Sequence, residues 1–214
     1  MMDPICFLQS GKHCLMYSGM EKETLVTQLQ MVLDQVSEIP EAELVLFQDR
    51  VCSLNPAAAS QTFPCGDAQA DAYITALMQR LSDRAEGRGR NEKGELPPIF
   101  LVIADWREFF EGAADETVVY LRDVVEMGQG LGVYLIAGGL RDGIVYLAQL
   151  GEKLTSRLLK QRHVILLGGS VAEHGLLQTK LSVEEERRPF GGQEACYILE
   201  DKTKQINLLS TKEG

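Results

Sequence analysis

The chain has 214 residues and a formal net charge of −10, from 21 Lys and Arg against 31 Asp and Glu. This length suits one domain with a full hydrophobic core. The acidic balance argues against sequence-independent binding to DNA or RNA, which needs cations to neutralise phosphates, and against an anionic membrane surface as the main partner.

The sequence gives no sign of a membrane-spanning segment, a signal peptide, a disulfide framework or a zinc motif. No apolar run approaches the roughly 20 residues that span a bilayer, and the start of the chain shows no signal peptide. The cysteines form no CxxC pair and the histidines have no metal-ligand spacing, so we expect reduced, mostly buried thiols and no structural zinc. These residues are Cys6, Cys14, Cys52, Cys65, Cys196, His13, His163 and His174.

The first half of the chain alternates apolar runs with helix-period segments, which predicts an α/β fold. Strands are expected over Ile5–Gln9, His13–Tyr17 and Ala42–Gln48. Apolar residues at helical spacing predict an amphipathic helix over Lys22–Val36. After a long loop, Asp67 is a good N-cap for a second helix, which gives way to a solvated, Gly-rich loop over Arg84–Glu95.

The second half continues this alternation around Ile99–Asp105, a strand that is apolar on both faces as a central parallel strand should be. Further strands are predicted over Val133–Ala137 and His163–Leu167. Helices are predicted over Glu116–Met127, over Gly143–Leu154, and from a Ser170 cap to Leu177. A terminal hairpin is predicted from Glu194–Leu199 and Gln205–Leu209, with Asp201–Lys204 as its turn.

The order of strand, Gly-containing turn, helix and a later strand ending in Asp is typical of a P-loop nucleotide-binding domain. In the Walker A pattern G-x-x-x-x-G-K-[ST], the glycines let backbone amides face the phosphates, the lysine neutralises charge and the hydroxyl holds Mg²⁺. Aligned on its lysine, the chain reads Met16-Tyr17-Ser18-Gly19-Met20-Glu21-Lys22-Glu23-Thr24. Met16 and Glu21 replace both glycines, and Glu23 stands at the hydroxyl position, with Thr24 next.

The two acidic residues of this segment oppose phosphate binding. A carboxylate about 4 Å from a phosphate charge costs roughly 4 kcal/mol per unit pair at an effective dielectric near 20. Glu21 and Glu23 each impose part of that cost. The pattern alone therefore favours Lys22 as a surface residue in the first turn of a helix, and only the later strand keeps the nucleotide-site interpretation open.

That later strand resembles a Walker B element, which ends in an acid that binds Mg²⁺ through water. Asp105 is in the metal-side position, and Trp106 replaces the catalytic Glu that usually follows. An indole cannot accept a proton from water. The alternative for Asp105 is an N-cap of Trp106–Phe110. Trp106 is expected either to border the vacated pocket or to pack in the core.

A local basic cluster, formed by Arg84, Arg88, Arg90 and Lys93, is interpreted as part of a solvated loop, with a partner-binding or subunit-contact loop as the alternative. Arg141 follows a strand end, where α/β sheets place ligand contacts, so it is a candidate sensor or arginine finger with a surface arginine as the default.

Two glycine pairs and one arginine pair have simpler interpretations. Gly138-Gly139 and Gly168-Gly169 are expected to serve tight strand exits. Arg187-Arg188 follows three glutamates and indicates a charged surface turn.

Four segments taken in order resemble the FtsK/SpoIIIE-type ATPases: Cys14–Thr24, Pro97–Asp105, Gly128–Ala137 and Leu159–Val164. The chain is most similar to the last ATPase module of EssC/EccC-type proteins, the membrane-anchored motors of type VII secretion. The Gly-rich turn before Val133 and the lysine-x-arginine entry to the strand at His163 are the more specific parts. The resemblance covers nearly the whole chain.

The resemblance implies an α/β, RecA-like P-loop NTPase fold, with a mostly parallel central sheet flanked by helices and a C-terminal β-hairpin. Residues 1–214 would be a single FtsK/SpoIIIE-like P-loop domain excised from a larger multi-module chain. Family members carry two or three such modules in tandem on the cytoplasmic side of a transmembrane anchor, and the terminal modules often have degenerate nucleotide sites.

Partners and site residues follow from the same resemblance. The last module of actinobacterial relatives binds the C-terminal export tail of a small helical-hairpin substrate of the WXG type. Expected partners are such substrates and adjacent ATPase modules, with the membrane reached only through the full-length protein, no nucleic acid, and a homo-oligomer by analogy with P-loop motors. No catalytic residue is assigned, and ATP with Mg²⁺ is expected to bind weakly. The degenerate nucleotide site carried over by motif comprises Ser18, Gly19, Met20, Glu21, Lys22, Glu23, Thr24 and Asp105, the last on the Mg²⁺ side.

Three functions remain open from the sequence. The first is a pseudo-ATPase module that recognises cargo or regulates an adjacent module. The second is a working NTPase that uses Lys22, Thr24 and Asp105, with a catalytic acid such as Glu108 or one from a neighbouring subunit. The third is a DNA translocase fragment, against which the net charge speaks.

Overall fold

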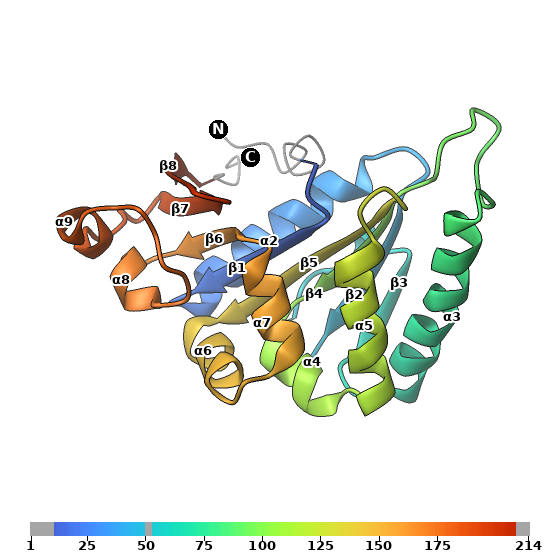
Figure 1. Ribbon diagram of the computed structural model, residues 1–214, viewed down its shortest axis with the longest axis horizontal. Helices are drawn as coiled ribbons and strands as arrows, with labels where there is room; N and C mark the ends of the chain where they lie inside the picture. The colour runs from blue at the N-terminus through green and yellow to red at the C-terminus, as the bar shows by residue number, and fades with distance from the viewer. Residues whose placement is uncertain (1–10, 50–52, 209–214) are drawn as a thin grey trace.

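The computed structural model describes residues 11–49 and 53–208, which form one eight-stranded sheet with helices on both faces (Figure 1). The strand expected over Ile5–Gln9 lies outside the described residues, as do Cys6, Cys52 and Leu209. The strands are β1 (Cys14–Gly19), β2 (Glu43–Gln48), β3 (Gln61–Pro64), β4 (Ile99–Ile103), β5 (Val133–Leu140), β6 (His163–Leu167), β7 (Glu194–Leu199) and β8 (Lys202–Asn207).

The helices connect these strands in the alternation that the sequence predicts. They are α2 (Lys22–Ser37), the 3₁₀ turn η1 (Pro56–Ala58), α3 (Ala68–Ala85), α4 (Trp106–Gly112), α5 (Asp115–Met127), α6 (Arg141–Gln149), α7 (Lys153–Lys160), α8 (Val171–His174) and α9 (Val183–Arg187). As predicted, the Asp67 side chain caps α3 by accepting from the Gln69 amide at 2.7 Å.

The sheet has the order β3-β2-β4-β5-β1-β6-β7-β8. The first six strands in the chain pair in parallel, and β7 and β8 add an antiparallel hairpin at one edge. This confirms the predicted fold class, a mostly parallel sheet flanked by helices and ending in a C-terminal β-hairpin.

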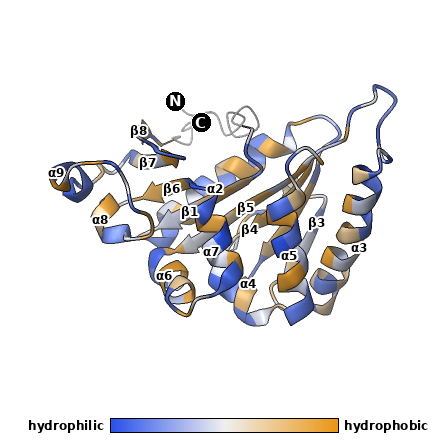
Figure 2. Ribbon diagram, in the orientation of Figure 1, coloured by the Kyte–Doolittle hydropathy of each residue, from blue (hydrophilic) through white to orange (hydrophobic). Residues whose placement is uncertain are grey.

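Two apolar layers hold the helices to the sheet. On one face α2 packs through Leu25 and Leu29 against the strands, and Figure 1 shows it behind the sheet. The other face is covered by α3 to α7, with α5 and α7 in front of the strands. In β4, Leu101 joins this second layer and Phe100 joins the first. The strand is therefore apolar on both sides. Figure 2 shows the helices changing along their length between apolar and polar colours.

Two predicted boundaries were wrong, each for a local reason, and one strand was missed. The single helix expected over Gly143–Leu154 is two helices, because Gly151 adopts a left-handed φ of 72° and Glu152 starts a new helix by capping it. The short strand β3 was not predicted. The hairpin turn is at Glu200 and Asp201, so β8 begins earlier than expected, and Glu200 has a left-handed φ of 54°.

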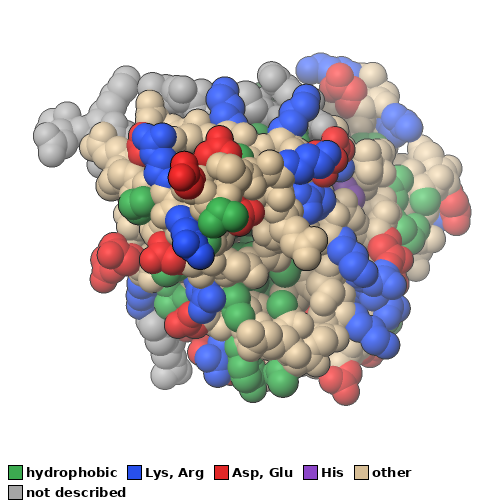
Figure 3. Space-filling view, turned by 60° about the vertical axis from the view of Figure 1, so that its left-hand side comes forward, with side chains coloured by type: hydrophobic (Ala, Val, Ile, Leu, Met, Phe, Trp, Pro, Cys, Tyr) green, Lys and Arg blue, Asp and Glu red, His purple; other side chains and the backbone are tan. Residues whose placement is uncertain are grey.

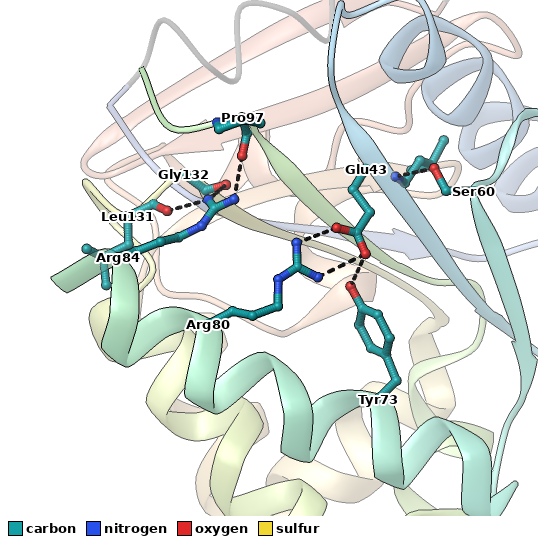
Figure 4. A network of polar contacts seen from close by, with 9 residues as sticks. Glu43, Ser60, Tyr73, Arg80, Arg84, Pro97, Leu131 and Gly132 are labelled. Carbon is teal, nitrogen blue, oxygen red and sulfur yellow. Dashed lines mark hydrogen bonds and ion pairs between the residues drawn. The ribbon is translucent and has the colours of Figure 1, made fainter. Parts of the chain in front are cut away.

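A polar network fastens α3 to the sheet (Figure 4). The Glu43 carboxylate of β2 accepts hydrogen bonds from the Nη1 and Nη2 atoms of Arg80. It also accepts one from the Tyr73 hydroxyl at 2.8 Å. The Arg84 guanidinium is held by backbone carbonyls, those of Pro97 and Leu131 at 2.7 Å and that of Gly132 at 3.3 Å.

The residues of the predicted basic cluster therefore lie in two different environments. Arg84 is not in the solvated loop but in the last turn of α3, only 7% exposed. Arg88 is exposed and pairs with Asp83 and Glu86.

The described residues were also compared with the requirements for a membrane-spanning helix and for a metal site. Within the described residues, no helix is long and apolar enough to cross a bilayer. In the same part of the chain, no three His, Cys, Asp or Glu side chains are grouped so as to hold a metal ion.

Candidate functional site

The carboxyl ends of the parallel strands bring the two halves of the candidate site to one edge of the sheet. Gly19 ends β1 opposite Leu140 of β5 and Leu167 of β6. Asp105 follows β4, and β4 pairs with β5 on the side of β5 that faces away from β1. The ends of β1 and β4 therefore flank the end of β5, at the edge where open α/β sheets bind their ligands.

The connection from β1 to α2 is very short. The strand continues to Gly19, the helix begins at Lys22, and only Met20 and Glu21 lie between them. Tyr17 to Gly19, which the Walker A alignment places inside a phosphate-binding loop, instead pair with both neighbouring strands. The Met20 amide donates to the Leu167 carbonyl at 3.0 Å, which extends this pairing by one more residue.

Gly19 is explained by packing at this point. A Cβ built on it would lie 2.9 Å from the Leu25 Cβ and 3.2 Å from the Glu21 carbonyl oxygen. The first turn of α2 thus folds back tightly onto the end of β1. The glycine serves this close approach.

A buried serine–histidine contact lies at the end of β1. The Ser18 Oγ is 2.9 Å from the His174 Nδ1, and the His174 Nε2 is 2.9 Å from the Gly168 carbonyl oxygen. A carbonyl only accepts, so Nε2 carries the hydrogen and Nδ1 accepts the Ser18 hydroxyl. Both side chains are 0% exposed, and burial lowers the pKa of His174, which favours the neutral ring.

Arg141, the candidate sensor or arginine finger, is engaged within the chain. Its Nε donates to the His174 carbonyl at 3.3 Å and its Nη1 to Asp142 at 2.8 Å. The helix α8 is therefore held from two sides, by the His174 ring on β1 and by Arg141 at the start of α6. Sequence reasoning missed His174, whose signal was its place just after the Gly168-Gly169 turn at a strand end.

The remaining predicted residues of the turn lie on the surface. Met20 is 40% exposed and packs over the turn after β6, because a Cβ on Gly169 would lie 3.1 Å from the Met20 Cγ. Glu21 and Glu23 are exposed, Lys22 and Thr24 are partly exposed, and no described residue forms an ion pair with Lys22. Glu21 occupies the N-cap position of α2 without a side-chain cap bond.

Asp105 caps α4, as its alternative interpretation predicted. Its Oδ1 accepts from the Arg107 amide at 3.0 Å and from the Glu108 amide at 3.2 Å. Burial raises the pKa of its carboxyl. Trp106 packs in the core with its Nε1 donating to the Thr155 Oγ1 at 2.9 Å, so the packing interpretation of the tryptophan is confirmed.

The glycine pair of β5 was interpreted wrongly. Gly138 and Gly139 lie inside the strand, which continues to Leu140. A Cβ on Gly138 would lie 2.4 Å from the Leu29 Cδ1, so this glycine admits α2 close to the sheet. Gly168 and Gly169 do form a strand exit, with left-handed φ values of 71° and 62°.

Comparisons with known proteins find resemblance in structure alone. No protein-family model matches the sequence, and no curated protein matches it. The cytoplasmic domain of EssC superposes with a TM-score of 0.66 at 16% identity, over 91% of this chain and 39% of that one. EssC ATPases 2 and 3 from Geobacillus thermodenitrificans give a TM-score of 0.76 at 13% identity, over 94% of this chain and 37% of that one.

A third structure adds a bound peptide. Thermomonospora curvata EccC, comprising ATPases 2 and 3 in complex with a signal sequence peptide, gives a TM-score of 0.71 at 12% identity, over 95% of this chain and 38% of that one. The chain spans less than two fifths of the length of each of these structures. In its architecture, the chain is a structural neighbour of the EssC and EccC type VII secretion ATPase modules.

Proposed function

We propose that this chain is a degenerate ATPase module of a type VII secretion motor, which acts in protein export by recognising substrates or by regulating neighbouring ATPase modules. The observation that carries the proposal is the two-residue connection between β1 and α2. A phosphate-binding loop needs several consecutive amides pointing at the ligand, whereas here only Met20 and Glu21 separate β1 from the helix. Hydrolysis is then weak or absent.

The residues present fit Mg-ATP poorly. Glu21 and Glu23 place two carboxylates at the start of α2, where the helix dipole would otherwise favour a phosphate. Asp105, the position for the Mg²⁺ side, already accepts two amide hydrogens as a helix cap.

The proposed partners come from the structural neighbours. One is the cytoplasmic domain of EssC, and two contain ATPases 2 and 3, of EssC and of EccC. The EccC structure has a signal sequence peptide bound. By analogy, the chain works beside further modules on the cytoplasmic side of a membrane-anchored protein and binds small helical WXG-type substrates. Assembly into a homo-oligomer is part of the same analogy.

The test is calorimetric titration with Mg-ATP together with a phosphate-release assay, on the wild type and on Lys22→Ala. The matched control is Lys153→Ala, because Lys153 is also the first residue of a helix but lies at α7. We expect no micromolar binding and no turnover in any of the three proteins. Micromolar binding with turnover that only Lys22→Ala abolishes would establish the working NTPase instead.

A separate titration addresses the DNA translocase. The acidic surface predicts no DNA affinity at any salt concentration. DNA binding that weakens steeply as salt is added would support the translocase fragment.

A further inference from the structure

Residues 170–190 form a segment, here called the flap, that lies between two pairs of glycines. It contains α8 and α9, which Figure 1 shows at the left end of the molecule beyond β6. Gly168-Gly169 precede the flap with left-handed φ values of 71° and 62°, and Gly191-Gly192 follow it. Glycine restricts the backbone angles little, so both ends of the flap can act as hinges.

The flap is fastened to the rest of the chain mainly through α8. All of its residues are described, and among them only Ser170, Val171 and His174 are buried. The helix α9 buries none of its residues. Figure 3 turns this end of the molecule forward, and Lys, Arg, Asp and Glu side chains are interspersed there on the surface. The outer side of the flap therefore faces water, and its inner side is held at α8.

The His174 ring is the buried polar anchor of the flap. It lies between the Ser18 hydroxyl of β1 and the Gly168 carbonyl, at 2.9 Å from each. Other side-chain ties of the flap are partly or fully exposed: Arg141 with the His174 carbonyl, Arg162 with the Gln178 carbonyl, and Lys180 with Asp201. Exposed ties of this kind contribute little to stability, so the closed position depends on the buried ring.

The closed flap needs this ring in its neutral form. The Gly168 carbonyl fixes the hydrogen on Nε2, so Nδ1 is the acceptor for Ser18. A proton on Nδ1 would remove that acceptor and place a cation where water is excluded. Burial has the largest effect and lowers the pKa of His174, and the Gly168 carbonyl raises it. The charged groups that face the ring are Arg141, which opposes protonation, and Glu173, which favours it.

We propose that residues 170–190 are a pH-sensitive flap, which His174 holds over the end of β1 at neutral pH and releases as the medium becomes acidic. In the open flap the ring is hydrated and takes up a proton with the ordinary pKa of 6.5, whereas in the closed flap its pKa is lower. The closed form therefore has its full advantage above pH 6.5 and loses it as the pH falls through the lower pKa. Opening uncovers Ser18 at the candidate site.

Hydrogen exchange of the ¹⁵N-labelled chain at pH 7.5 and pH 5.5 measures the open fraction. The reporters are the amides of residues 174 and 175, which donate to the Ser170 and Val171 carbonyls at 3.1 Å. The reference amides are those of β4, inside the sheet between β2 and β5. The test variant is His174→Gln, because glutamine offers a donor and an acceptor but does not titrate. Its matched control is His13→Gln, since His13 is also a buried histidine but contacts the Val125 carbonyl, outside the flap.

After correction for intrinsic exchange rates, the protection of the reporter amides is expected to fall several-fold, by up to about tenfold, from pH 7.5 to pH 5.5. The same fall is expected in His13→Gln, and a change of no more than about twofold in His174→Gln. At both pH values, the β4 amides are expected to stay more than about tenfold better protected, because the flap opens without global unfolding.

Three results would overturn the proposal: reporter protection that does not change with pH, reporter protection equal to that of β4, or a pH dependence that persists in His174→Gln. If the glutamine variant does not fold, the ring carbon shifts of His174 in the wild type decide the question. A midpoint below pH 6.5 supports the flap, and a midpoint at or above pH 6.5 refutes it.

Discussion

His163 makes the stability of the chain depend on pH. It is the first residue of β6 and is 1% exposed. Its Nδ1 is 2.9 Å from the Cys14 carbonyl oxygen and its Nε2 is 2.9 Å from the Tyr197 hydroxyl. The carbonyl only accepts, so Nδ1 donates and Nε2 accepts from the tyrosine. Burial lowers the pKa of His163 from 6.5 to about 4.

The size and sign of the effect follow from these two pKa values. The unfolded chain binds a proton at this ring below about pH 6.5, whereas the folded chain does so only near pH 4. The stabilising contribution is therefore complete above pH 6.5 and is lost as the pH falls to about 4. Each pH unit in this window removes up to about 1.4 kcal/mol, which amounts to about 3 kcal/mol across it.

The variant His163→Asn isolates this term. Asparagine keeps a donor for the Cys14 carbonyl and does not titrate. Urea unfolding of both proteins between pH 8 and pH 4 gives their difference in free energy of unfolding, in which the contributions of the other histidines cancel. We expect the advantage of the wild type to shrink by about 3 kcal/mol over this range. A difference that stays constant with pH would refute the argument.

Three further predictions concern the carboxyl ends of the parallel strands. Gly138→Ala is expected to lower the free energy of unfolding by about 1–3 kcal/mol, because its Cβ would meet the buried Leu29; unchanged urea unfolding would contradict this. Asp105→Ala is expected to cost about 1 kcal/mol as a lost cap, whereas Asp105→Asn keeps the cap. The pKa of Asp105 is raised in the folded chain, so ionisation of this carboxyl disfavours folding. Above the folded pKa, the free energy of unfolding of the asparagine variant is therefore expected to match or exceed that of the wild type. A loss of stability equal to that of the alanine variant would contradict the cap. Ser18→Ala leaves the buried His174 Nδ1 without its donor and is expected to cost about 1–3 kcal/mol by the same measurement, with no loss contradicting the contact.

Elements whose signal is local were predictable. The α2 helix followed from apolar spacing, and β4 from an apolar run long enough for a strand. Asp67 and Asp105 are short acceptors just before a helix, and both caps were anticipated. By contrast, β3 at Gln61–Pro64 is a mostly exposed edge strand, whose pairing with β2 leaves no apolar alternation to detect.

The candidate site was predictable only in part. The alternation of strands and helices placed Lys22 and Asp105 at one edge, because parallel strands align their carboxyl ends. The contact between Ser18 and His174 joins residues 156 positions apart. It depends on a four-residue helix and a glycine turn, whose placement is set by tertiary packing.

The position of Arg84 has a practical consequence for engineering. Residues 86–95 form an excursion that leaves α3 just after Arg84 and returns at Pro97, whose carbonyl the same guanidinium holds. The two stems are joined by that side chain, so the length between them has little influence on the rest of the fold. Since doubling a flexible loop costs only about 0.6 kcal/mol, this excursion is the natural place to splice an epitope or a fluorescent reporter while the sheet edge keeps its native shape.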